Sequence, residues 1–236
     1  ASSSVDELIK RISRAVPGTG ATLQVAAEHK YDGQRAQIHC TTPDDIRIFS
    51  RKIDDMTYKY PDVVAVIRRS ARSGRPFILD AEIVAVKAGH MEGQGSSAAA
   101  SETDGGKEAE IAAFQSLSTR KRKNVTEANA ATESVAVKLF LFDLLLLGDD
   151  VLLHRPFLER RALMREEFVE ERGVLGFAAA TDIDLVCHQA ETKSSTGSTS
   201  KEGAGVTSSE TGGPKELETA LRQAIAASCE GLMVKR

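Results

Sequence analysis

Tryptophan is absent from this 236-residue chain, and aromatic residues as a whole make up only 5% of it. Long apolar runs are also lacking. The longest, LFLFDLLLL, is interrupted by Asp143 and falls short of the roughly 18 residues that a membrane-spanning helix needs. We therefore expect no membrane span and interpret this run as a buried strand. Apolar residues at 41% and charged residues at 28% are typical of a globular protein.

Cysteine is scarce, and neither sign of charge is in large excess. Cys40, Cys187 and Cys229 are widely separated, which fits neither a disulfide framework nor a CxxC zinc motif, so we expect reduced packing residues. The chain begins without a basic segment followed by an apolar run, which predicts an intracellular protein. A net charge of −3 lacks the broad basic field with which a single domain grips nucleic acid, so other regions would have to share that task.

The spacing of apolar residues predicts a mixture of helices and strands. Period-two alternation across residues 23–50, broken by the Asp32-Gly33 turn, is typical of strands with one packed and one polar face. Residues 88–110 and 190–213 are rich in Ser, Gly, Ala, Thr and Glu, and we expect them to be disordered surface insertions because they hold few large apolar groups. The remaining expected elements are an amphipathic helix near residues 4–16, a helix from Pro61, strands in PFILDAEIVAV and at 138–147, a helix at 156–171 capped by Gly173, a helix from Pro214 and a strand in EGLMVKR.

The segment EHKYDGQR places a lysine beside a tight turn. Glu28 and Lys30 are two positions apart, so in a strand their side chains point the same way. A lysine attacks phosphorus only when its amine is neutral, and that form is rare at neutral pH. A site that uses a lysine in this way must lower the pKa of the amine through burial or neighbouring cations, such as Arg35 or a bound metal. Taken alone, the segment favours a surface hairpin whose charges are merely solvated.

KYDGQR resembles the motif K-x-D-G-x-R of the covalent nucleotidyltransferases, which include DNA ligases, RNA ligases and mRNA capping enzymes. RIFSRKIDDMTYKYPD, FILDAEIVA, LFLFDLLLL and EGLMVKR resemble further ligase motifs in the expected order. EHKYDGQRAQIH and FQSLSTRKRKNV are similar to eukaryotic replicative DNA ligases of the ligase I type. The resemblance implies an α+β covalent nucleotidyltransferase fold, ATP-grasp-like, with antiparallel sheets flanked by helices and interrupted by the two insertions.

The resemblance also implies that residues 1–236 form a partial DNA ligase adenylation domain. The sequence stops after the fourth motif, and the fifth motif, the OB-fold domain and the amino-terminal DNA-binding domain of the family have no counterpart in it. We therefore expect that this chain does not seal nicks by itself and that its self-adenylation is weak.

The same resemblance implies a role for each matching residue. Lys30 would be the nucleophile that becomes joined to AMP, and Glu82 and Glu230 would hold Mg²⁺, which prefers such oxygen ligands. The implied nucleotide contacts are Glu28 with the adenine amine, Arg35 with the ribose or a phosphate, Arg51 lining the site, Glu82 with the ribose, Phe142 stacked on adenine and Lys235 near the phosphates. Asp80 would brace its strand. The basic run at 120–123 is interpreted either as a solvated face or as a contact with the DNA backbone.

The implied activity is ATP-dependent sealing of nicks in double-stranded DNA through a lysyl-AMP intermediate, with ATP and Mg²⁺ as cofactors. A monomeric catalytic core in the nucleus, serving DNA replication, repair and recombination, is expected from the same resemblance. Two alternatives stay open at this point. One is an mRNA capping guanylyltransferase, and the other is a truncated module that binds a nucleotide without catalysis.

Overall fold

The computed structural model describes residues 5–14, 21–87, 110–120, 135–187 and 213–236. The strands in these ranges form two mainly antiparallel sheets with helices packed against them, so the predicted α+β class is confirmed. The helices are α1 (Val5–Arg14), α2 (Pro61–Ser70), α3 (Gln115–Ser118), α5 (Phe157–Glu167) and α6 (Gly213–Ala226), with short 3-10 helices η1 (Thr57–Lys59) and η2 (Leu152–His154). The strands are β1 (Ala21–Lys30), β2 (Gln34–Thr42), β3 (Asp45–Phe49), β4 (Phe77–Ala85), β5 (Val137–Leu147), β6 (Asp150–Val151), β7 (Leu175–Phe177), β8 (Ala180–Cys187) and β9 (Gly231–Lys235).

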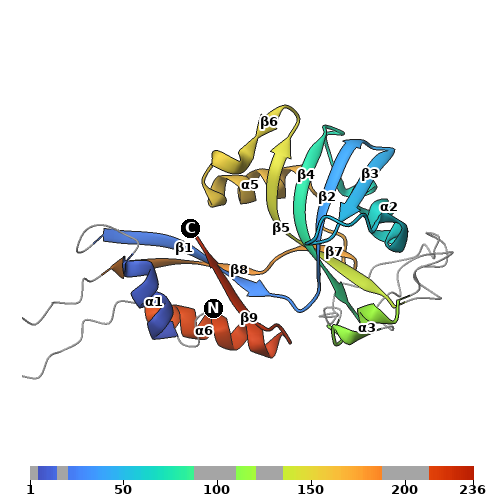
Figure 1. Cartoon of the computed structure of the whole chain (residues 1–236). Coiled ribbons are helices and arrows are strands. Elements are labelled where there is room, and N and C mark those ends of the chain that lie inside the picture. Colours follow the sequence, from blue (N-terminus) through green and yellow to red (C-terminus); the bar gives the residue numbers. More distant parts are fainter. Residues whose placement is uncertain (1–4, 15–20, 88–109, 121–134, 188–212) are drawn as a thin grey trace, which may run out of the picture.

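The first sheet has three strands in the order β8-β1-β9, with β1 antiparallel to both neighbours. Helices α1 and α6 lie along one side of it (Figure 1). Val25 and Ala27 of β1 pack into an apolar cluster with residues of β8, α6 and α1. Because alternate residues of a strand point to opposite faces, Glu28 and Lys30 share the face that is turned away from these helices, as predicted.

The second sheet runs in the order β3-β2-β4-β5-β6, and β7 joins it in parallel beside β5. Ile38 and Cys40 of β2 are buried in an apolar core that includes residues of α2 and β4. The alternate residues Arg35, Gln37 and His39 are only half-buried and lie on the opposite face. This arrangement confirms the predicted packed and polar faces.

Within the described residues, the chain passes between the two sheets at residues 31–33 and again at residues 178–179. The first crossing brings the end of β1 beside the start of β2 (Figure 1). Gly33 is required there, because a Cβ atom at this position would overlap the carbonyl oxygen of Ile83 and would lie 2.9 Å from Cγ of Glu82. Glycine therefore lets β2 begin directly against β4.

Two predictions about the elements are wrong, and three strands are missed. Helix α5 ends at Glu167, because Phe168 turns into an extended conformation that buries its ring against Phe77, with ring centres 5.0 Å apart. Gly173 (φ 77°) therefore does not cap this helix and lies in the turn before β7. Strands β6, β7 and β8 are not among the predicted elements. The two predicted insertions fall outside the described residues, apart from Glu110 and Gly213.

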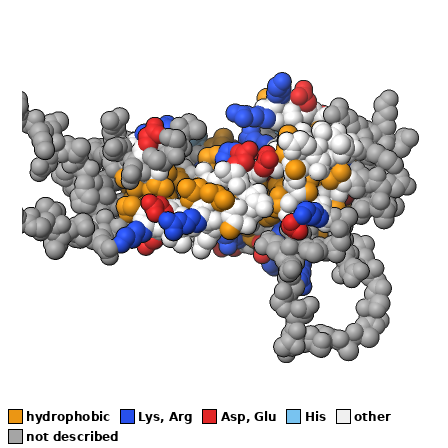
Figure 2. Space-filling view, turned by 90° about the horizontal axis from the view of Figure 1, so that it is seen from below, with side chains coloured by type: hydrophobic (Ala, Val, Ile, Leu, Met, Phe, Trp, Pro, Cys, Tyr) orange, Lys and Arg blue, Asp and Glu red, His pale blue; other side chains and the backbone are white. Residues whose placement is uncertain are grey.

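None of the described helices is both long and apolar enough to cross a membrane. Figure 2 views the molecule from the side of α6, where apolar side chains and charges of both signs are interspersed. No single sign of charge dominates the described part of this face, in keeping with the small net charge of −3.

Arg120, the first residue of the basic run at 120–123, is neither solvated nor placed to contact DNA. Its side chain is fully buried, with the guanidinium 2.5 Å from a carboxylate oxygen of Asp62 and donating to the carbonyl of Val135 at 2.8 Å. The guanidinium also lies 4.9 Å from the ring centre of Tyr60. The structure therefore corrects both interpretations of this residue: Arg120 fastens α3 to α2. Residues 121–123 lie outside the described ranges.

Replacing Arg120 with alanine should lower the free energy of unfolding by about 3–5 kcal/mol, because Asp62 would lose its counter-charge beside the core. Arg155 is the matched control, since it forms an exposed ion pair with Asp150. Its alanine variant should lose less than about 1 kcal/mol. Urea unfolding measures both values, and equal losses would show that Arg120 behaves as an ordinary surface arginine.

Candidate active site

Lys30 is the last residue of β1, and its ammonium forms an ion pair with the carboxylate of Glu230. The backbone causes this pairing: Lys30 lies opposite Gly231 of the antiparallel strand β9, and the Glu230 N–H donates to the Lys30 carbonyl at 2.8 Å. Both side chains are about half exposed, at 45% and 44%. An ammonium that is engaged with a carboxylate has no lone pair for attack. Nucleophilic use of Lys30 therefore requires Glu230 to find another positive partner.

Glu82 approaches the same amine from the second sheet. It lies on β4, opposite Arg35 of β2 and Phe140 of β5. Burial raises the pKa of Glu82 to about 7, although the positive charges of Lys30 and Arg35 oppose that rise. Among the residues that the structure describes, no cation forms an ion pair with Glu82. The carboxyl is thus held in surroundings that disfavour its charged form.

These surroundings fit a divalent cation. Such an ion would supply the positive charge that Glu82 lacks and would draw Glu230 away from Lys30. In the described part of the chain, no group of three or more His, Cys, Asp and Glu side chains could hold a metal ion. Mg²⁺ commonly binds through one or two carboxylates, with water and phosphate oxygens completing its coordination. Glu82 and Glu230 are therefore adequate protein ligands for it.

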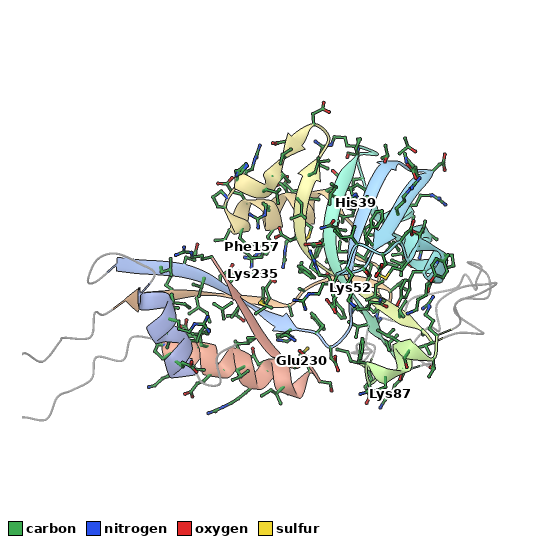
Figure 3. The ribbon with its side chains drawn as sticks, in the orientation of Figure 1. His39, Lys52, Lys87, Phe157, Glu230 and Lys235 are labelled. Carbon is green, nitrogen blue, oxygen red and sulfur yellow. The ribbon has the colours of Figure 1, made fainter. Side chains whose placement is uncertain are left out.

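Another group of site residues meets at the opposite end of β9. Glu28 is only 2% exposed, and its carboxylate lies 2.5 Å from the ammonium of Lys235. Burial raises the pKa of Glu28, and the charge and hydrogen bond of Lys235 oppose that rise. The Lys235 ammonium also lies 4.7 Å from the ring centre of Phe142 and 4.6 Å from that of Phe157. Figure 3 shows Lys235 beside Phe157 at this end of β9 and Glu230 at the other end.

A buried carboxylate beside an aromatic ring suits a flat base that carries an exocyclic amine. The carboxylate accepts a hydrogen bond from the amine, and the ring packs on the face of the base. The structure therefore brings together Glu28 and Phe142, as the sequence predicts. Lys235 lies at this end of β9, with its ammonium on Glu28. Its expected position near the phosphates stays a prediction.

Arg35 is held by Asp80, which lies on the same face of the second sheet. The guanidinium of Arg35 is 2.6 Å from the Asp80 carboxylate, and the Gln37 amide donates to the other carboxylate oxygen at 3.3 Å. The ring of His39 hydrogen-bonds to Gln37 at 2.9 Å, and burial lowers the pKa of His39. This polar ladder holds the guanidinium near Glu82, so Asp80 anchors the Arg35 side chain. The predicted role of Asp80 in bracing its own strand stays a prediction.

Arg51 is a predicted site residue for which the described structure shows no polar contact with the others. It lies exposed in the turn after β3, and within the described ranges it makes no hydrogen bond or ion pair with the residues around Lys30. Its assignment to the nucleotide site stays a prediction.

The sequence analysis overlooks two aromatic residues at the site, Tyr31 and Phe157. Tyr31 occupies the unspecified second position of K-x-D-G-x-R, so no motif marks it. Phe157 begins α5 directly after Pro156, and its place at the start of an amphipathic helix resembles ordinary packing. Only the folded chain shows that the Phe157 ring lies against Lys235 and that the Tyr31 ring stacks on Phe140, the residue opposite Glu82.

Comparison with known proteins agrees with this geometry. A family model described as "ATP dependent DNA ligase domain" matches residues 4–236. The chain belongs to this family. The ligase domain is 31% identical over 214 residues to DNA ligase 1 of Dictyostelium discoideum, 33% over 217 residues to DNA ligase 1 of Drosophila melanogaster and 37% over 169 residues to DNA ligase 1 of Methanosarcina barkeri. These matches cover 90%, 90% and 72% of the ligase domain, but only 14%, 22% and 27% of those relatives.

Solved structures share the fold of the ligase domain. A mycobacterial DNA ligase D complexed with ATP and MES superposes with a TM-score of 0.51 at 19% identity, covering 94% of this chain and 52% of that one. The ligase domain from M. tuberculosis LigD gives a TM-score of 0.50 at 17% identity with the same coverage. At these identities the likeness shows the fold alone, and it confirms the predicted nucleotidyltransferase class.

The raised pKa of Glu82 predicts how the stability of the ligase domain depends on pH. A folded-state pKa of about 7 lies above the ordinary value of 4.5. The contribution of Glu82 is therefore fully present below about pH 4.5 and is lost as the pH rises through about 7. Glu82→Gln should lack this loss, so its stability relative to the parent should increase across that interval and stay constant above it. Denaturant titrations at stepped pH measure the difference.

Glu159→Gln, which changes an exposed carboxyl on α5, is the control and should follow the parent at every pH. Mg²⁺ should reduce the loss in the parent protein if Glu82 binds it, because the metal stabilises the charged carboxylate. If the free energy of unfolding of the parent and of Glu82→Gln changed in parallel with pH, the raised pKa of Glu82 would be contradicted.

Proposed function

We propose that this ligase domain transfers AMP from ATP to Lys30 and then to the 5′-phosphate at a nick in double-stranded DNA. One observation carries the proposal: Glu28 and Lys30 lie on one face of β1, with the acidic pair Glu82 and Glu230 around Lys30 and the Phe142 ring beside Glu28. Residues two apart in a strand are separated by roughly 6 to 7 Å. A single bound nucleotide can therefore meet the base-reading carboxylate and the amine together.

In the first step, the neutral Lys30 amine attacks the α-phosphorus of ATP. A P–N bond forms, the P–O bond to pyrophosphate breaks, and the amine loses a proton. Glu28 orients the adenine through its amine, and Arg35, braced by Asp80, is placed to neutralise charge on a phosphate or to hold the ribose. Mg²⁺ held by Glu82 and Glu230 would neutralise charge that develops on phosphate oxygens.

In the later steps, an oxygen of the DNA 5′-phosphate attacks the same phosphorus. The P–N bond breaks, and AMP passes to the DNA while the Lys30 amine is restored. The 3′-hydroxyl at the nick then attacks the 5′-phosphate and releases AMP, which seals the strand. These steps are phosphoryl and nucleotidyl transfers, for which positioning and charge stabilisation supply most of the rate enhancement.

We also propose that nicked DNA is gripped with the help of regions beyond this domain, since the net charge of −3 offers no broad basic field. We propose further, from the resemblance of EHKYDGQRAQIH and FQSLSTRKRKNV to eukaryotic ligases of the ligase I type, a role in DNA replication, repair and recombination in the nucleus. One relative, DNA ligase 1 of Methanosarcina barkeri, is archaeal. The proposed nuclear location therefore rests on the resemblance to the eukaryotic enzymes alone. A monomeric core remains part of the proposal.

Labelling with nucleotide tests the first step. The chain is incubated with Mg²⁺ and α-labelled ATP or GTP, alone and joined to the carboxy-terminal region of the full-length protein. ATP should leave acid-stable label on the protein, and Lys30→Ala should reduce that label by at least about 100-fold, because the nucleophile is removed. Lys87→Ala is the matched control: Lys87 is an exposed lysine in an ion pair with Glu110, remote from β1, and its variant should label normally (Figure 3).

Other outcomes separate the alternatives. Label from GTP alone would favour the capping guanylyltransferase. Absence of label in both forms of the protein would favour a module that binds a nucleotide without catalysis. Label that persists in Lys30→Ala would remove Lys30 from the mechanism.

A further inference from the structure

Tyr31 lies in the first crossing between the two sheets, directly after Lys30. Its ring stacks on Phe140 of β5, with ring centres 3.8 Å apart and planes inclined by 14°. The ammonium of Lys138 lies 4.7 Å from the centre of the Phe140 ring, which adds a cation–π contact to the stack. The residue that follows the nucleophile is therefore fastened to the opposite sheet.

The same residue also joins the two crossings. The Ala179 N–H, in the second crossing, donates to the Tyr31 hydroxyl at 3.3 Å. The carbonyl of Ala179 in turn accepts a hydrogen bond from the N–H of His29 at 2.8 Å. Two hydrogen bonds thus connect residues 29–31 to Ala179, at the place where both chain segments pass from one sheet to the other.

The stack is separate from both apolar cores. Phe140 is buried, yet neither it nor Tyr31 belongs to the cluster under α2 or to the cluster under α6. Ordinary core packing therefore does not account for the position of Tyr31. The stack instead connects the surroundings of two site residues. Phe140 lies directly opposite Glu82 across β4 and β5, and Tyr31 directly follows Lys30.

We propose that Tyr31 is a positioning residue that sets the distance between the Lys30 amine and Glu82 by clamping the two sheets together. The proposal rests on the proposed function for its catalytic consequence. The flat stack fixes the end of β1 against β5. The hydrogen bond from the His29 N–H to the Ala179 carbonyl, which does not involve the Tyr31 hydroxyl, holds the two crossings together. A displacement of about 1 Å at a reacting group can reduce a rate by about 100-fold.

Rates of Lys30 adenylation at saturating ATP and Mg²⁺ test the clamp. Tyr31→Leu should lower kcat, here the first-order rate constant of Lys30 adenylation at saturating ATP, by about 10- to 100-fold. The KM for ATP should change by less than about threefold, because Glu28 and Phe142 still bind the base. Tyr31→Phe keeps the stack and should retain kcat within about threefold. A uniform loss in both variants, or a change in KM alone, would overturn the positioning role.

Phe168→Leu is the matched control for lost stability. Phe168 is a buried aromatic that packs edge-to-face on Phe77 in the core of the second sheet. Its leucine variant should lower Tm at least as much as Tyr31→Leu does, yet retain kcat within about twofold. If Phe168→Leu reduces kcat as strongly as Tyr31→Leu at a similar Tm, Tyr31 acts through general stability and the proposal fails.

Amide hydrogen exchange gives a reading that does not depend on activity. Peptides that cover residues 28–34 and 176–182 should exchange at least about tenfold faster in Tyr31→Leu than in the parent, whereas peptides from α6 should not change. Absence of adenylation in both forms of the parent protein, alone and joined to the carboxy-terminal region, would defeat the proposed function. Unchanged exchange at the two crossings would defeat the clamp even in an active enzyme.

Discussion

The pairing of β9 with β1 is the interaction on which the candidate site depends. The register places Gly231 opposite Lys30 and Lys235 opposite Ala26, so charges of opposite sign meet at both ends of β9. Lys30 meets Glu230, and Glu28 meets Lys235. A slip of one residue would exchange the two faces of β9 and separate these groups. The alignment of two short backbones thus fixes four charged side chains at once.

Each of these ion pairs occupies a group that a nucleotide would need. The acceptor that would read the base is covered by an ammonium, and the amine that would attack phosphorus is covered by a carboxylate. Under the proposed function, the nucleotide would replace Lys235 as the partner of Glu28, and the metal would replace Lys30 as the partner of Glu230. The arrangement avoids leaving the buried Glu28 carboxylate without a counter-charge, which would be costly. The second sheet contributes the complementary element, a carboxyl at Glu82 whose charge is disfavoured.

The sequence predicts this site where chemistry and local spacing coincide. The alternation of β2 places Arg35 on the polar face, but only the motif resemblance implies the roles of Arg35 and Phe142. The register of β9 then brings Lys30 and Glu230 together. Other features depend on contacts between distant positions. The basic run beginning at Arg120 gives no sign that Arg120 pairs with Asp62 of α2. Strand β8 does carry a signal, because buried Ile183 and Leu185 alternate with exposed Asp182 and Asp184, and the neighbouring low-complexity segment obscured it.

The position of β9 along the chain has a consequence for how the protein is made. On the ribosome, β1 and the whole second sheet emerge before residues 230–235, and β9 must return to a strand made some 200 residues earlier, with β1 its sole strand partner in the described sheet. Closing so long a loop is slow compared with local folding. A nascent chain therefore exposes Lys30 and Glu28 without their carboxylate and ammonium partners. Until β9 pairs with β1, a nucleotide would encounter a site that lacks Glu230 and Lys235.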